Sequence, residues 1–192
     1  LIFFLSLILL YSCDQPSQQE KATNTISNPP NEIMNNYSDY GMDMLLGKFN
    51  PTDHEDYVAV EEKYADRPGM YLHQDTYDAF IKMYRAAMED SVQLIIRSAT
   101  RNFESQKGIW ERKWTGETKV DGEDISKTIE DPVKRALKIL EYSSMPSTSR
   151  HHWGSDVDLN SFNNAWFETG KGKKIWDWLE ENAPSFGFCR PY

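Results

Sequence analysis

The chain has 192 residues and a net charge of −9 at pH 7, which argues against a nucleic-acid partner because such proteins need a basic surface. Its hydrophobic fraction of 39% and its six tryptophans predict a folded core, and the length fits one domain with extensions. The two cysteines, Cys13 and Cys189, lie near opposite ends of the chain, so neither a disulfide framework nor a thiolate-rich metal site is expected.

The first ten residues, LIFFLSLILL, are almost wholly apolar. This run is too short to span a bilayer, which takes about 20 residues, and it is typical of the central part of a signal peptide. Because no Met and no basic residue precede it, we expect the sequence to begin within its leader. Residues 10–13, Leu-Tyr-Ser-Cys, resemble a bacterial lipobox, in which Cys13 becomes the lipidated first residue of the mature protein. The alternative is a plain cleaved signal with a coincidental cysteine.

These features predict three parts of the chain. Residues 1–12 are a partial lipoprotein signal peptide, and residues 41–192 are the folded domain. Residues 13–40 are rich in Gln, Asn, Ser, Thr and Pro, a composition that buries little and is typical of a flexible linker. We therefore expect the protein in the bacterial cell envelope, held to a membrane by a lipid anchor on a periplasmic or other extracytoplasmic face.

Within the domain, the first strong pattern is a run of apolar residues at helical spacing over residues 73–91, with Asp75 as the expected N-cap. Residues 92–98, VQLIIRS, alternate as a strand does. A second helix then carries Trp110 and Trp114. A helix before a strand and another after it favour the α+β class.

The second half of the domain continues in the same way. Residues 115–130 are polar and predict a loop, and Asp131-Pro132 is a helix start signal. This helix is expected to end at Met145-Pro146 and to bury Val133, Ala136, Leu137 and Leu140. A last helix is expected over residues 171–183 and a strand from residue 186. The fold class is α+β, with a small antiparallel sheet packed with helices.

The stretch STSRHHWGSDVDLN, residues 147–160, has the residue types of a metal site. His151 precedes an expected turn at Gly154, and residues 156–159 alternate polar and apolar like a half-buried strand. Asp156 and Asp158 then face the same side, and a chain that folds back at Gly154 would bring His151 beside one of them. Metal sites combine imidazoles and carboxylates in this way. The alternative is a surface histidine pair followed by ordinary turn residues.

An arginine stands at the end of the predicted strand. Arg101 is well placed there to meet an anion, since its planar fork suits a carboxylate better than a lysine does. The alternative is a surface arginine paired with Glu104 or Glu111, which would contribute little.

Both segments resemble one family, the VanY-type D-alanyl-D-alanine carboxypeptidases. The four positions of its zinc motif, Ser-x-His…Gly…Asp, match Ser149, His151, Gly154 and Asp158. Its earlier Ser-x-x-Arg…Gln block matches Ser98, Arg101 and Gln106 in the family's order. The resemblance implies a hedgehog/DD-peptidase fold.

The resemblance also implies roles for these residues. His151 and Asp158 would be ligands of a zinc ion, Zn²⁺, with Asp156 as a supporting group or a bystander. Arg101 and Ser149 would be catalytic: Arg101 would hold the substrate or stabilise the oxyanion, and Ser149 would hydrogen-bond the substrate peptide. Gln106 would line the substrate pocket.

The family's third zinc ligand and general base come from a Glu…His element on a closing strand, which this sequence does not contain. We therefore expect a chain truncated at its C-terminus. The implied function is removal of D-alanine from peptidoglycan stem peptides. Three alternatives remain: an L,D-carboxypeptidase or wall endopeptidase using the same site, a non-catalytic peptidoglycan-binding lipoprotein, or a folded domain whose histidine cluster has no catalytic role.

Overall fold

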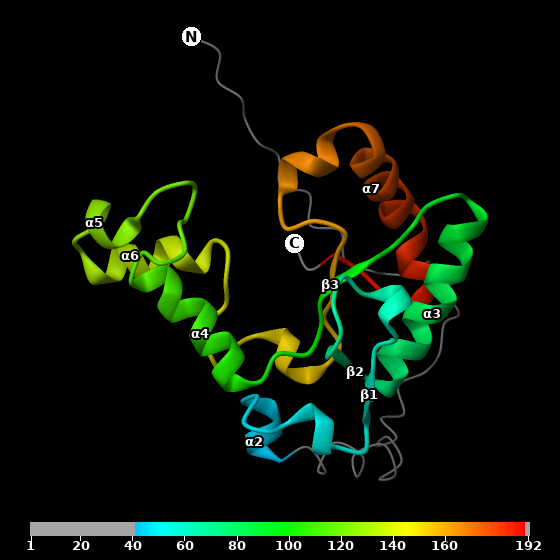
Figure 1. Ribbon diagram of the computed structural model, residues 1–192, viewed down its shortest axis with the longest axis horizontal. Helices are drawn as coiled ribbons and strands as arrows, with labels where there is room; N and C mark the ends of the chain where they lie inside the picture. The colour runs from blue at the N-terminus through cyan, green and yellow to red at the C-terminus, as the bar shows by residue number, and fades with distance from the viewer. Residues whose placement is uncertain (1–40, 191–192) are drawn as a thin grey trace, which may run out of the picture. The chain divides into compact units, whose positions relative to one another are not determined.

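The computed structural model describes residues 41–190 of the chain (Figure 1). The predicted leader, the linker and the lipidation site at Cys13 lie outside the described residues, so they and the envelope location stay predictions. Among residues 41–190, no helix is long and apolar enough to cross a membrane.

The strands are short and form two antiparallel pairs. β1 (Tyr57–Ala59) pairs with β2 (Tyr71–His73), and β3 (Ile96–Ser98) pairs with β4 (Asp158–Leu159). A single parallel bridge joins Ala65 to Ile96. Strands this short contribute few hydrogen bonds, so both strand pairs depend on the side chains and helices that pack against them.

Two long helices, α3 (Gln74–Glu89) and α7 (Gly170–Asn182), pack with the strands to form the main hydrophobic core. Trp178 of α7 donates a hydrogen bond from Nε1 to Asp90 Oδ2 over 2.7 Å and so connects α7 to the end of α3. The side chains that fill the core come from both helices and from the strands and loops between them: Val60, Tyr64, Met70, Leu72, Phe80, Met83, Ala87, Val92, Leu94, Ile96, Ala99, Ile175, Trp178 and Ala183.

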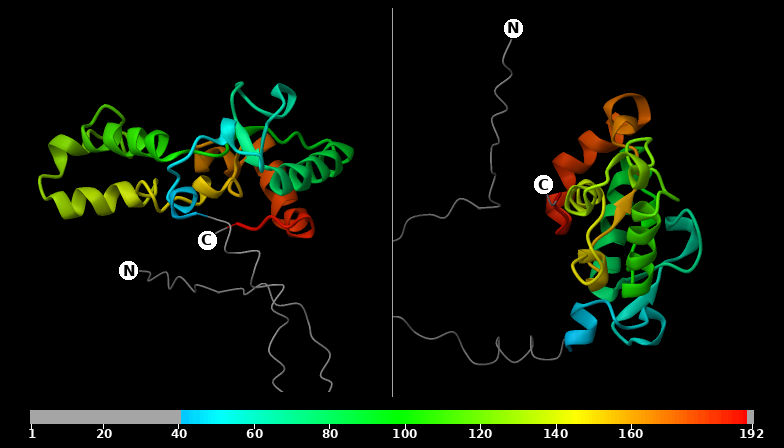
Figure 2. Two further views of the ribbon diagram at one scale, coloured as in Figure 1. Left: turned by 90° about the horizontal axis from the view of Figure 1, so that it is seen from below. Right: turned by 90° about the vertical axis from the view of Figure 1, so that its left-hand side faces the viewer.

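A second, smaller core holds together a helical arm, residues 103–145, which contains α4 (Phe103–Trp114), α5 (Ile125–Thr128) and α6 (Pro132–Leu140). Figures 1 and 2 show α4 and α6 side by side, away from the core that α3 and α7 cover. The buried residues of the arm are Val120, Ile125 and Ile139, with Trp110, Trp114 and Ile129 packed against them.

Short helical segments make up the other elements. They are α2 (Met42–Leu45) and the 3-10 helices η1 (Pro51–Asp53), η2 (Glu62–Tyr64), η3 (Arg150–Trp153), η4 (Asn164–Glu168) and η5 (Ala183–Phe186).

The predicted α+β class is confirmed, but several element predictions are wrong. The strand expected over residues 92–98 is limited to β3. No strand forms over the described residues 186–190: 3-10 helix η5 ends at Phe186, and residues 188–190 have no regular secondary structure. The N-cap of α3 is His73, whose Nδ1 accepts from the N–H of Asp75 over 3.3 Å. The loop expected over residues 115–130 contains the short helix α5.

The C-terminal end and the buried face of α6 also differ from the prediction. The helix ends at Leu140, before the expected stop. Its buried residue is Ile139, whereas Val133, Leu137 and Leu140 are exposed. The start at Asp131-Pro132 is confirmed, because the Asp131 carboxylate accepts from the N–H groups of Val133 and Lys134.

Candidate active site

A glycine turn positions the histidine of the motif. Ser149 caps η3 by accepting from the N–H of His151 over 3.3 Å, and η3 ends at Gly154, whose φ is +67°. A Cβ at Gly154 would lie 2.5 Å from the Tyr57 ring and 2.8 Å from the backbone nitrogen of His73. Only glycine fits this close approach at positive φ, so the expected turn is confirmed and has a steric cause.

The two carboxylates of the motif meet the imidazole that precedes the turn. Asp158 Oδ2 lies 3.4 Å from His151 Nε2, and Asp156 Oδ2 lies 3.5 Å from the same nitrogen. Val157 and Leu159 pack against the core instead. The predicted alternation, with the two aspartates opposite Val157 and Leu159, is therefore confirmed, and the structure places both aspartates, rather than one, beside His151.

Hydrogen bonding determines which nitrogen of His151 faces the carboxylates. The ring is buried, with an exposed fraction of 5%, and its Nδ1 lies 2.8 Å from the carbonyl oxygen of Ala99. Since a carbonyl can only accept, Nδ1 carries a proton, and Nε2 is the nitrogen that faces the carboxylates. Metal-binding histidines are commonly oriented by such a bond from the second nitrogen.

Arg101 joins the same group of side chains. Its N–H donates to the carbonyl oxygen of His151 over 3.0 Å, and its Nη2 lies 3.9 Å from Asp158 Oδ2. Burial lowers the pKa of the Arg101 guanidinium, although Asp158 and Asp156 oppose this effect. The chain thus brings together His151, Asp158 and Arg101, residues separated by up to 57 positions in the sequence.

The Asp158 carboxyl group is kept ionised by its neighbours. Burial alone would raise its pKa, but hydrogen bonding and charge from His151, the charge of Arg101 and a hydrogen bond with Ser98 together lower the pKa below its ordinary value. An ionised carboxylate beside the Nε2 of an imidazole is a donor set for a divalent cation.

The second histidine of the pair has a different role. His152 is fully buried, its Nε2 accepts from the N–H of Ser147 over 3.1 Å, and its Nδ1 donates to the carbonyl of Arg101 over 2.6 Å. Burial lowers the pKa of His152, so the ring stays neutral. Both nitrogens are used by the backbone, and neither is available to a ligand.

Gln106 and Ser149 are both buried near this group. Gln106 has an exposed fraction of 1%, and its Nε2 donates to the carbonyl of Ser144 over 2.6 Å, which ties α4 to the segment leading into the motif. Its Oε1 has no hydrogen-bond partner within residues 41–190. The substrate-binding role of Gln106 and the catalytic role of Ser149 stay predictions.

The donor set fits part of a zinc site. Two ligand atoms about 2.1 Å from a tetrahedral zinc ion lie about 3.4 Å apart, and the distance between His151 Nε2 and Asp158 Oδ2 is 3.4 Å. A catalytic zinc site takes three protein ligands, and no cluster of three or more His, Cys, Asp or Glu side chains able to hold a metal forms in the described part of the chain. His151 and Asp158 would therefore supply two of the three ligands.

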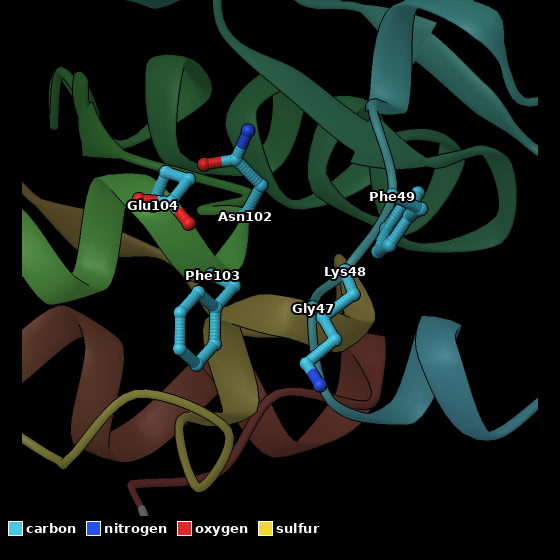
Figure 3. A pocket seen from close by; sticks show the side chains of 6 residues that line it. All are labelled: Gly47, Lys48, Phe49, Asn102, Phe103 and Glu104. Atoms are coloured by element: carbon cyan, nitrogen blue, oxygen red, sulfur yellow. The ribbon is translucent and has the colours of Figure 1, made fainter.

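Two cavities lie near these residues. The larger, about 760 Å³, contacts Asp158 and is otherwise lined by Asn164, Phe167, Glu168, Lys173, Trp176 and Arg190. Figure 3 shows the smaller one, about 330 Å³, between the segment after α2 and the start of α4. None of the predicted site residues lines the smaller cavity, so the larger one is the candidate for a substrate.

Comparison with known proteins identifies the family. Residues 69–192 match the family described as "VanY: D-alanyl-D-alanine carboxypeptidase". A D-alanyl-D-alanine carboxypeptidase from Enterococcus faecalis is 29% identical over 154 residues, which is 78% of this chain and 50% of that protein. The chain thus spans half the length of this curated relative.

Solved structures show the same fold. VanYB in complex with D-alanine-D-alanine has a TM-score of 0.56 and 22% identity, covering 74% of this chain and 69% of that one. A mutant of the vancomycin-resistance D,D-pentapeptidase VanY in complex with zinc has a TM-score of 0.51 and 25% identity. The match covers 70% of this chain and 71% of that one. The LdcB LD-carboxypeptidase has a TM-score of 0.51 and 22% identity, and the match covers 73% of this chain and 59% of that one. The family match extends over most of the described residues, and the chain belongs to the VanY family of D-alanyl-D-alanine carboxypeptidases.

Proposed function

We propose that the protein is a zinc-dependent D-alanyl-D-alanine carboxypeptidase that acts on peptidoglycan stem peptides. The observation that carries this proposal is the 3.4 Å approach of His151 Nε2 to Asp158 Oδ2, with the Arg101 guanidinium beside the same carboxylate. Membership of the VanY family supports the reaction, and the zinc complex of a VanY mutant supports the metal.

Each predicted site residue has a defined role in this proposal. His151 and Asp158 would hold the zinc ion, which when bound polarises a carbonyl and lowers the pKa of water. Arg101 would stabilise the negative charge that develops on the carbonyl oxygen, or hold the carboxylate of the substrate. Ser149 would hydrogen-bond the substrate peptide, and Gln106 would line its pocket.

Substitution of the two metal ligands tests the proposal. In the purified full-length protein, His151→Ala and Asp158→Asn are each expected to abolish bound zinc and to lower D-alanine release at least 1000-fold, because removing a metal ligand removes the group that activates water. The measurements are metal content by elemental analysis and D-alanine release from a stem pentapeptide. Asp177→Asn, which removes an exposed α7 carboxylate paired with Lys173, is the matched control and should change neither. Full activity in His151→Ala would disprove the assignment.

A second candidate function is an L,D-carboxypeptidase, which the fold shared with LdcB supports. The products distinguish the two. A D,D-carboxypeptidase converts a pentapeptide stem to a tetrapeptide, an L,D-carboxypeptidase converts a tetrapeptide to a tripeptide, and an endopeptidase cuts cross-linked dimers. Binding of these peptides without cleavage would instead support a peptidoglycan-binding protein.

A further inference from the structure

Asn160 adopts a left-handed backbone conformation directly after β4. Its φ is +59°, which is uncommon for residues other than glycine and is tolerated best by asparagine and aspartate. β4 has only two residues, and Asp158 is the first of them. The chain therefore leaves the extended conformation two residues after Asp158, so backbone pairing alone gives β4 few hydrogen bonds to hold it in place.

The side chain of Asn160 adds to this pairing. The N–H of Asn160 donates to the carbonyl of Ile95 over 2.8 Å. In a regular antiparallel pair, the backbone carbonyl of the same residue would accept the returning bond. Here the N–H of Ile95 donates instead to Asn160 Oδ1 over 3.4 Å, and Asn160 Nδ2 donates to the carbonyl of Gln93 over 2.9 Å. The amide thus replaces the backbone group that the left-handed turn has moved away.

These bonds fix the register that places Asp158 in the candidate site. The pair that Asn160 forms with Ile95 continues the register of β4 against the start of β3. The register then shifts by one residue, so that Asp158 lies opposite Ser98, whereas a regular ladder would place it opposite the preceding residue of β3. In this position Asp158 Oδ2 lies 3.4 Å from His151 Nε2. A slip of one residue would turn the side chains of β4 to the opposite face and remove the carboxylate from His151.

Asparagine is the residue that meets both requirements at position 160. Its amide offers an acceptor and two donors, and its backbone tolerates positive φ. Aspartate would keep the acceptor for the N–H of Ile95 but would lose the donor to the carbonyl of Gln93. Glycine would keep the backbone conformation and would lose both side-chain bonds.

We propose that Asn160 is a positioning residue for the metal ligand Asp158, because its amide fixes the register of β4 against β3 and so holds the Asp158 carboxylate beside His151 before a metal ion binds. The inference rests on the proposed zinc-dependent function and extends it to a residue that would itself contact neither metal nor substrate. A ligand held in place before binding loses less freedom when the metal arrives. Zinc affinity should therefore depend on the amide of Asn160.

The test is Asn160→Gly in the full-length protein, which removes the amide without straining the backbone. The Kd for zinc, measured by competition with a chromophoric chelator, is expected to rise about 10- to 100-fold, the range seen when groups that orient a metal ligand are removed. The visible absorption spectrum of the protein loaded with Co²⁺ should also change, because it reports the geometry of the ligands. Asn160→Asp should give a smaller rise in Kd, and it supplies the same comparison if Asn160→Gly does not fold.

The matched control is Asn163→Gly, which removes an amide from the same connection that caps η4 by accepting from the N–H of Ala165 over 3.1 Å. It should leave the zinc Kd and the Co²⁺ spectrum unchanged. A lower melting temperature of zinc-free Asn160→Gly with the wild-type Kd and spectrum would assign Asn160 a purely structural role and overturn the inference. Equal rises in Kd for both asparagine variants would do the same. A wild type that binds zinc but releases no D-alanine would contradict the proposed function alone.

Discussion

The adjacent residues His151 and His152 differ in the partners of their ring nitrogens. His151 donates from Nδ1 to Ala99 and leaves Nε2 facing Asp156 and Asp158, whereas both nitrogens of His152 bond backbone groups. The first arrangement leaves one ring nitrogen that no backbone group uses, and the second leaves none. The resemblance to the VanY motif selected His151 correctly for the position beside Asp158, but the structural role of His152 depends on residues distant in sequence.

The ring of His152 leaves no room for a side chain at position 47, so glycine is required there. A Cβ at Gly47, where φ is +75°, would lie 2.3 Å from His152 Nδ1. We expect Gly47→Ala to lower the free energy of unfolding by about 3 kcal/mol, in the range of severe core substitutions. Gly69→Ala is the control: it has a similar φ of +79° with nothing within 4 Å of the new Cβ, and should cost only about 1 kcal/mol. Urea unfolding measures both, and equal losses would mean that the His152 ring moves aside at no cost.

At the scale of elements, the helical arm shows where a helical pattern is ambiguous. The apolar residues of α6 lie on more than one side of the helix, and the sequence favoured Val133, Leu137 and Leu140 as buried. In the arm, α6 packs on one side, against α4, the loop around Val120 and, through Arg135, the carbonyls of Ser126 and Ile129. Ile139 takes that side, and Val133 and Leu137 remain 66% and 58% exposed. The helix could be predicted from the sequence, but its orientation could not.

Polar contacts fix that orientation and make the arm sensitive to acid. Lys138 of α6 lies 2.6 Å from Asp121 Oδ2, and the Tyr142 hydroxyl donates to the same carboxylate. Hydrogen bonds from Lys138 and Tyr142 lower the pKa of Asp121 below its ordinary value of 3.8. The stabilisation by a carboxylate of lowered pKa is fully present above the unfolded pKa and is lost as pH falls through the folded pKa.

We therefore expect Asp121→Asn to lower the melting temperature of the protein at pH 7, by an amount that shrinks below about pH 4 as the wild-type carboxylate is protonated. The measurement is thermal unfolding followed by tryptophan fluorescence between pH 3 and pH 7, since Trp110 and Trp114 lie in the arm. Glu117→Gln, an exposed carboxylate with no ion pair among residues 41–190, should have little effect at either pH. If the melting temperatures of the wild type and Asp121→Asn differ by the same amount at pH 3 as at pH 7, the charge of the Asp121 carboxylate is not the cause of the difference.

At the scale of the whole molecule, the candidate site depends on one strand pairing. β4 carries Asp158 and pairs with β3, after which the chain continues to Arg101. The sequence predicted which residues lie together at the candidate site, because the motif is local and the family's order of blocks is preserved. It overestimated the strands, since β3 and β4 have only three and two residues and tertiary packing, rather than local alternation, decides where pairing stops.

Asp158 would be held both by the pairing of β4 with β3 and by the metal. Zinc should therefore stabilise the whole domain. A ligand at 100 times its Kd that binds only the folded state adds about 2.7 kcal/mol to the free energy of unfolding, which for a chain of this size corresponds to a rise of about 5–10 °C in melting temperature. We expect this rise when zinc is added to protein treated with a chelator, and a return to the starting value when the chelator is restored. His151→Ala and Asp158→Asn should abolish the rise, whereas Asp177→Asn should keep it. A full rise in His151→Ala would mean that the ion binds elsewhere, because an imidazole held by Ala99 with its Nε2 toward Asp158 would then contribute nothing to metal affinity.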